Sequence, residues 1–112
     1  MGGNVFVKSG RVQTILENAT ATGAGDWIFK DAPLSSVQAF GSTTSGSGAT
    51  VVSIEATNNI NGSYIVIGTI SLTLGITVTT DGFIIQAPWK YIRGNVTSIS
   101  GTGASVTVEA CI

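Results

Sequence analysis

The chain has 112 residues and a mass of 11.4 kDa, the size of one small domain with a modest core. Charged residues are only 10% of it, and a net charge of -1 provides no field that would attract nucleic acid or an anionic membrane. It contains no histidine, which excludes a Ser-His-Asp triad, a Cys-His dyad and every histidine-containing zinc site.

The N-terminal region differs in pattern from the rest of the chain. Short β-like runs at residues 5–7 and 12–16 precede a stretch of small residues, 19–25, that is typical of a loop or hinge. We therefore predict an arm and hinge over residues 1–25 and a β-sandwich domain over residues 26–112. Such an arm lies either on a neighbouring subunit or, as a terminal strand, on the sheet of its own domain.

From Trp27 onward, turn signals recur between short runs of alternating apolar and polar residues, which is typical of an all-β domain. The turn signals lie at residues 31–33, 41–48, 58–62, 81–82, 87–88 and 100–103. Eight or nine short antiparallel strands need a second layer to cover their apolar faces. The prediction is an antiparallel β-sandwich of jelly-roll or immunoglobulin-like type.

A weak internal repeat relates residues 45–51 to residues 100–106. Both copies are rich in Gly and Ser and predict hairpin turns, with the strand before each turn pairing back across it. The strands that follow alternate in polarity, so each has one apolar face. These faces consist of Val52, Ile54 and Ala56 in the first copy, and of Ala104, Val106, Val108 and Ala110 in the second.

Residues 70–79 alternate strictly between apolar and polar residues, which predicts a long strand. Its apolar face comprises Ile70, Leu72, Leu74, Ile76 and Val78. There is no charge between Glu55 and Asp81, but the period of two argues against a membrane helix, and no membrane role is expected. Asp81-Gly82 predicts a hairpin that leads into residues 83–85. The pattern leaves open whether this strand is central or at an exposed edge, where it would be an aggregation hazard.

The reactive side chains do not form a catalytic pattern. The acidic residues stand apart, at turns or on polar strand faces, so we interpret them as solvated or turn-forming. They are Glu17, Asp26, Asp31, Glu55, Asp81 and Glu109. Cys111 is the single cysteine, so neither a disulfide within the chain nor a CxxC pair is possible. No enzymatic activity, cofactor or metal ion is expected.

The aromatic residues are few and therefore informative. Trp27 and Phe29 are expected to share the face of one strand. Trp89, Tyr91 and Arg93 are expected to form a row on the face of a different strand. Aromatic residues with arginine are typical of protein interfaces, and stacked aromatic rings also bind sugars. The alternative is that these rings belong to the core, with Arg93 at its edge. The interface candidates are Phe6, Trp27, Phe29, Trp89, Tyr91 and Arg93.

The C-terminal part of the chain resembles a known family. Residues 87–97, Ala-Pro-Trp-Lys-Tyr-Ile-Arg-Gly-Asn-Val-Thr, and residues 99–108, Ile-Ser-Gly-Thr-Gly-Ala-Ser-Val-Thr-Val, resemble the end of small structural proteins of tailed bacteriophage particles, among them capsid decoration or cement proteins. Residues 37–56 resemble them more loosely. The resemblance implies a non-enzymatic protein on the capsid surface of the virion, made in the bacterial cytoplasm, with the major capsid protein or another virion protein as its partner.

The resemblance also implies a homo-oligomer, a trimer in preference to a dimer, that stabilises the head by bridging capsid subunits. The low charge density agrees with this, because uncharged surfaces cost less to desolvate on association. Two alternatives remain. One is a module on the head or a fibre that binds glycans or the host surface through Trp27 or Trp89, and the other is a tail-tube or head-completion subunit that forms rings through its sheet edges. The native mass of the purified chain is the first measurement that would distinguish the bridging oligomer from these alternatives.

Overall fold

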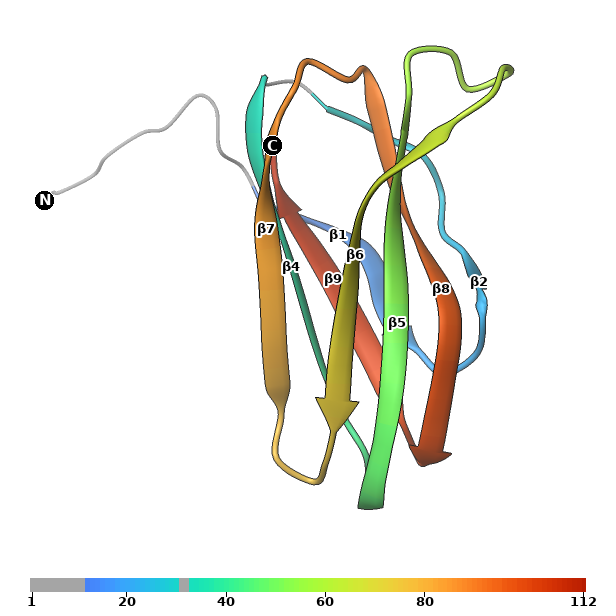
Figure 1. Cartoon of the computed structure of the whole chain (residues 1–112), viewed down its shortest axis with the longest axis vertical. Helices are drawn as coiled ribbons and strands as arrows, with labels where there is room; N and C mark the ends of the chain where they lie inside the picture. The colour runs from blue at the N-terminus through green and yellow to red at the C-terminus, as the bar shows by residue number, and fades with distance from the viewer. Residues whose placement is uncertain (1–11, 31–32) are drawn as a thin grey trace, which may run out of the picture.

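The computed structural model describes residues 12–30 and 33–112, which form two antiparallel sheets packed face to face (Figure 1). The predicted all-β sandwich is confirmed. Sheet A has the strand order β1-β9-β4-β7 and sheet B the order β2-β8-β5-β6, with β3 also paired to β8. The strands are β1 (Val12–Ala19), β2 (Gly23–Ala24), β3 (Ile28–Phe29), β4 (Leu34–Ser42), β5 (Ser45–Thr57), β6 (Ile65–Leu74), β7 (Thr79–Gln86), β8 (Tyr91–Thr102) and β9 (Ser105–Cys111).

The strand pairing is nested in a regular way. The first strand pairs with the last, β2 and β3 pair with β8, β4 pairs with β7, and β5 pairs with β6. Successive pairs alternate between the two sheets, so the chain wraps around the sandwich as a folded ribbon (Figure 1). This is the jelly-roll topology, and it decides between the two sandwich types that the sequence left open.

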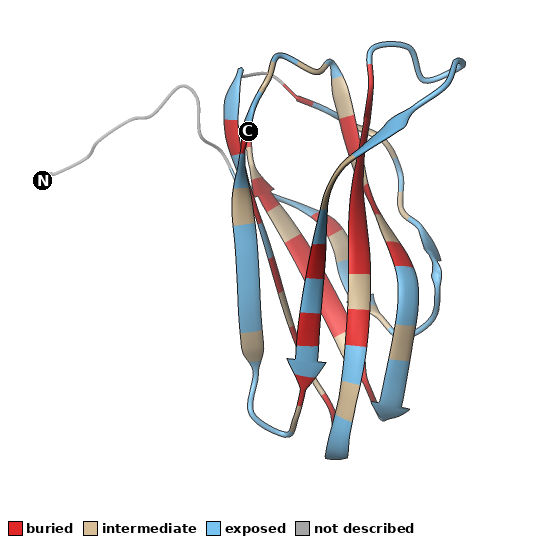
Figure 2. Cartoon of the chain, viewed as in Figure 1, coloured by how far each residue is buried: buried red, intermediate tan, exposed pale blue. Residues whose placement is uncertain are grey.

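The core lies between the sheets and is made by the inward side chains of alternate strand residues (Figure 2). Val52, Ile54 and Ala56 of β5 have no exposed surface, and the face of β9 that begins with Val106 is equally buried. Both apolar faces predicted from the repeat are therefore confirmed. Burying each of these side chains contributes about 1.5–3 kcal/mol, less for alanine, before the cost of chain entropy.

The segment expected to form an arm and hinge is divided between described and undescribed residues. Its described part belongs to the sandwich, because β1 pairs with β9 in sheet A and β2 pairs with β8 in sheet B. Within the single chain, this part therefore has the arrangement of strands on the sheets of its own domain. Residues 1–11, which include Phe6, lie outside the described residues.

The two hairpins predicted from the repeat are wrong. β4 and β5 flank the first turn but lie in different sheets, and so do β8 and β9 at the second turn. Glycines with positive φ, Gly46 at 69° and Gly103 at 65°, let the chain bend sharply at both places. A glycine-rich turn fixes the local bend, but the apolar faces on both sides decide that the chain crosses to the opposite sheet. The two turns instead lie beside each other, where Ser45 pairs with Thr102.

The strand predicted over residues 70–79 is correct for its first half only. Ile70, Leu72 and Leu74 are buried in β6, but the strand ends there, and Ile76 and Val78 are 73% and 59% exposed in the following turn. The hairpin predicted at Asp81-Gly82 is also wrong, because both residues lie within β7 and pair with β4. A Cβ on Gly82 would lie 2.2 Å from the carbonyl oxygen of Val37, so this glycine permits close approach of two strands.

Candidate interaction site on sheet B

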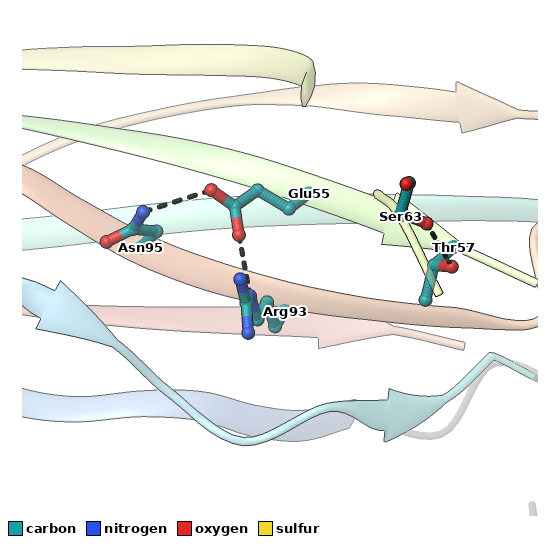
Figure 3. A network of polar contacts seen from close by, with 5 residues as sticks. All are labelled: Glu55, Thr57, Ser63, Arg93 and Asn95. Carbon is teal, nitrogen blue, oxygen red and sulfur yellow. Dashed lines mark hydrogen bonds and ion pairs between the residues drawn. The ribbon is translucent and has the colours of Figure 1, made fainter. Parts of the chain in front are cut away.

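The outer face of sheet B holds an ion pair between its two central strands. Glu55 of β5 lies opposite Arg93 of β8, and its Oε1 accepts a hydrogen bond from Arg93 Nε at 2.6 Å (Figure 3). Glu55 Oε2 accepts a second hydrogen bond from Asn95 Nδ2 at 3.0 Å. The Glu55 side chain is only 3% exposed and that of Arg93 20%. Both carboxylate oxygens are therefore satisfied, as a buried charge requires.

Two aromatic rings enclose the guanidinium group of Arg93. Its Cζ lies 4.3 Å from the ring centroid of Trp27 and 4.7 Å from that of Tyr64. The two rings contact each other edge to face, with centroids 6.1 Å apart. Such cation–π contacts contribute about 0.5–2 kcal/mol each, more where water is excluded. We call these five residues, Trp27, Glu55, Tyr64, Arg93 and Asn95, the aromatic–arginine cluster.

A second aromatic pair extends the cluster along β8. Phe29 of β3 pairs in register with Tyr91, and their rings meet edge to face at 6.0 Å. The Lys90 ammonium lies 5.7 Å from the Phe29 ring centroid. Phe29 is 52% exposed, so this pair presents apolar surface to the solvent. Together the cluster and this pair form a face of aromatic rings around two cations.

The loop that carries Tyr64 is fixed at its base by Thr57. The Thr57 Oγ1 lies 2.8 Å from the carbonyl oxygen of Ser63 (Figure 3). It also lies 2.9 Å from the carbonyl oxygen of Asn59 and accepts a hydrogen bond from the Asn59 N–H. Since Thr57 is buried, this hydroxyl joins the two ends of the loop away from water. The loop extends beyond the end of the sandwich (Figure 1), yet it returns Tyr64 to the guanidinium group.

Replacing Thr57 by valine tests this role, since valine keeps the shape but removes the hydroxyl. We expect the free energy of unfolding to fall by about 1–3 kcal/mol, because buried polar groups lose their partner. Urea unfolding gives this value, and tryptophan fluorescence reports whether Tyr64 still contacts Trp27. Thr73→Val, on an exposed position of β6, is the matched control. A loss equal to that of the control would contradict the anchoring role.

The connection between β7 and β8 is fixed by Lys30 and Asn58. Lys30 is buried, and its Nζ donates a hydrogen bond to the Ala87 carbonyl at 2.6 Å. This burial lowers the pKa of the Lys30 amine below its usual value. The Lys30 N–H donates to the Lys90 carbonyl, and the Lys90 N–H donates to Asn58 Oδ1 at 3.0 Å. These bonds hold Lys90 beside the aromatic face.

Trp89, in the same connection, does not continue the row of Tyr91 and Arg93, so that part of the prediction is wrong. It precedes β8 and packs against the core. With Ile67 and Phe83 it lines a cleft of about 190 Å³ at the edge where β6 and β7 come together. The connection bends at Ala87 and Lys90 and β8 begins only at Tyr91, so the strict alternation of a strand does not extend back to residue 89.

The structure brings together four of the six interface candidates and adds three residues. Trp27 and Phe29 share the outer face of sheet B with Tyr91 and Arg93, as predicted, whereas Trp89 lies apart. No local pattern in the sequence indicates Tyr64 or Asn95, and Glu55, which is predicted to be solvated, is buried and paired. The rarity of charged residues could have indicated the Glu55–Arg93 pair. In a chain with so few charged side chains, an acidic and a basic residue on interior strands are expected to pair.

No group of three or more metal-binding side chains occurs among residues 12–30 and 33–112. Within the same residues, no helix has the length and apolar character that crossing a membrane requires. Comparisons with models of protein families, with curated proteins and with solved structures find no match to this chain.

Proposed function

We propose that this protein is a non-enzymatic binding protein whose aromatic face on sheet B contacts another protein. More particularly, we propose a decoration or cement protein of a bacteriophage head, which bridges capsid subunits as a homo-oligomer at the virion surface. The observation that supports the contact surface is the enclosure of Arg93 by Trp27 and Tyr64 beside the exposed Phe29. Tryptophan, tyrosine and arginine are the residues that most often dominate interface energetics.

The rigidity of this face supports a role in binding. Arg93 is held by Glu55 from within the sheet and by a ring on each side, so its rotamer is fixed before any partner arrives. A side chain that is already ordered loses less entropy on association. Its terminal Nη groups form no bond among the described contacts and remain available as donors to a partner.

Glycan binding is the second candidate, because jelly rolls occur in lectins as well as in virion proteins, and a fold alone does not assign function. A sugar platform needs an open ring face beside free polar groups. Here one face of Trp27 is covered by Arg93, and the oxygens of Glu55 are already bonded. Trp89, the other platform considered, packs against the core. These features favour a protein partner.

The test measures binding to heads of the encoding phage that lack this protein, by co-sedimentation across a range of concentrations. Phe29→Ser removes an exposed ring of the face without creating a core cavity, and we expect the dissociation constant to rise at least about tenfold. Ile84→Ser is the matched control, since Ile84 is 63% exposed on β7 of the opposite sheet. It should leave binding unchanged.

Equal binding by the Phe29→Ser variant and the unmodified protein would contradict the assigned face. Weaker binding by the Ile84→Ser variant alone would place the contact on sheet A instead. A glycan array run with the same variants tests the second candidate, glycan binding. Specific sugar binding that Phe29→Ser or Trp27→Ala removes, together with no binding to heads, would favour glycan binding over the capsid proposal.

A further inference from the structure

Of the four sheet edges that the described residues form, three carry features that discourage pairing with another chain. β2 and β3 are two residues long each, β1 pairs with β9 through register shifts, and β7 carries the exposed Asp81 near its beginning. Short strands, bulges and charges at edges are the usual protections against strand addition. β6, at the edge of sheet B, has no proline and no charge over its whole length.

Among the described residues, no strand pairs with the outer edge of β6. From Gly68 to Leu74 the strand pairs with β5 without a register shift. The carbonyl of Val51, the β5 partner of Ser71, accepts a hydrogen bond from the Thr97 hydroxyl of β8, so this carbonyl is directed toward β8. At Thr73 the carbonyl accepts the Thr79 hydroxyl from beyond the edge. Residues two positions apart on a strand direct their backbone N–H and C=O groups to the same side. Ser71 and Thr69 therefore direct theirs outward, as Thr73 does.

The side chains at the two ends of β6 make this edge complementary to itself. Exposed apolar residues precede and begin the strand, namely Ile60, Tyr64, Ile65 and Val66, and two more, Ile76 and Val78, follow its end. A twofold antiparallel pairing places the beginning of one β6 beside the end of the other. The apolar residues before and at the start of β6 in one copy then pack against those after β6 in the other, and both sets are removed from water. The absence of charge from residue 56 to residue 80 means that no like charges oppose each other across the pair.

We infer that the β6 edge binds the β6 edge of a second copy of this chain. The regular stretch Gly68–Leu74 has Ser71 at its centre, so the twofold axis passes beside Ser71 and the two Ser71 residues exchange their N–H and C=O bonds. The two B sheets become one continuous sheet. The contact is isologous and closed, which also removes the unprotected edge as a site of open-ended aggregation.

The symmetry has a consequence for the aromatic faces. A twofold axis between antiparallel strands of one sheet stands perpendicular to that sheet, so both copies present the same side of sheet B in the same direction. Two aromatic–arginine clusters therefore face one surface. This part of the inference rests on the proposed function: a partner with repeated copies would be bound at two points at once, with the gain in avidity that this gives.

The test is the native mass of the full chain by light scattering across about a hundredfold range of concentration, with no capsid present, so it is separate from the head-binding test of the proposed contact face. We expect a dimer. In Ser71→Pro the ring removes the outward N–H but no bond to β5, so the monomer should fold while the dissociation constant of the dimer rises at least about tenfold. Ser71→Ala keeps the N–H and should remain a dimer.

Several results would overturn the inference. These are a monomer at every concentration, a trimer or ring, or a Ser71→Pro variant that dimerises as well as the unmodified chain. If deleting residues 1–11 abolishes the dimer and Ser71→Pro does not, residues 1–11 and not the β6 edge make the contact between the two copies. If Ser71→Pro does not fold, hydrogen exchange of the Thr69 amide decides: protection that grows with concentration supports the β6 contact, and exchange independent of concentration refutes it.

Discussion

Replacing Arg93 by methionine is expected to lower the free energy of unfolding by about 3 kcal/mol, although Arg93 lies on the outer face of a sheet. The change leaves the Glu55 carboxylate, with its 3% exposed side chain, without its charged partner, and a buried charge that has lost its partner is costly. The change also removes the cation between Trp27 and Tyr64. Because Arg93 is partly solvated, the lost cation–π contacts account for roughly 1 kcal/mol of the total. Urea unfolding monitored by tryptophan fluorescence measures the loss.

Two further variants separate the ion pair from the loss of a surface charge. Lys90→Met removes the other cation of the same face, which is exposed, and should change stability by less than about 0.5 kcal/mol. Adding Glu55→Gln to Arg93→Met should recover part of the lost stability, because the second change removes the unpaired charge. If Arg93→Met and Lys90→Met have the same small effect, Glu55 does not depend on Arg93 in solution and the cluster is not rigid.

Gly48→Ala is expected to lower the free energy of unfolding by about 2 kcal/mol. A Cβ on Gly48 would lie 2.1 Å from the carbonyl oxygen of Ser100 and 3.0 Å from Gly101 Cα, and a strand backbone cannot move aside as a flexible side chain can. This contact exists only because β5 begins beside the end of β8, so the prediction tests the jelly-roll topology. Thermal and urea unfolding provide the measurement.

Gly75→Ala is the matched control for this prediction. Nothing lies within 4 Å of a Cβ at Gly75, and its φ is not positive, so alanine should be neutral or stabilise by up to about 1 kcal/mol through the unfolded chain. A Gly48→Ala variant as stable as Gly75→Ala would mean that the two glycine-rich turns are not in contact. The hairpins suggested by the sequence would then need to be reconsidered.

The inward faces of the strands could be predicted from sequence, and the connections between strands could not. The alternation at Val52, Ile54 and Ala56 marks the face of the strand that points into the core, because successive side chains of a strand point to opposite sides. The turn at residues 41–48 carries no comparable signal. A glycine-rich bend suits a hairpin and a crossover between sheets equally well, and the choice depends on strands far away in sequence that compete for the same edge.

The candidate site shows the same division. Trp27, Phe29, Tyr91 and Arg93 were found because aromatic residues with arginine are conspicuous in a chain with so little charge. Their arrangement depends on register, which places Glu55 opposite Arg93, and on a loop that returns Tyr64 to the guanidinium group. Neither is encoded in local spacing. The prediction for Trp89 is wrong for the same reason, since the bend at Lys90 separates Trp89 from the alternation of β8.

The most direct test of the central claim is an electron cryomicroscopy map of the decorated phage head at a resolution that shows side chains. We expect the outer face of sheet B to lie against the capsid, with Trp27, Phe29 and Arg93 in the contact. Sheet A against the capsid, with the aromatic–arginine cluster exposed to solvent, would contradict the account, as would the absence of this protein from the head.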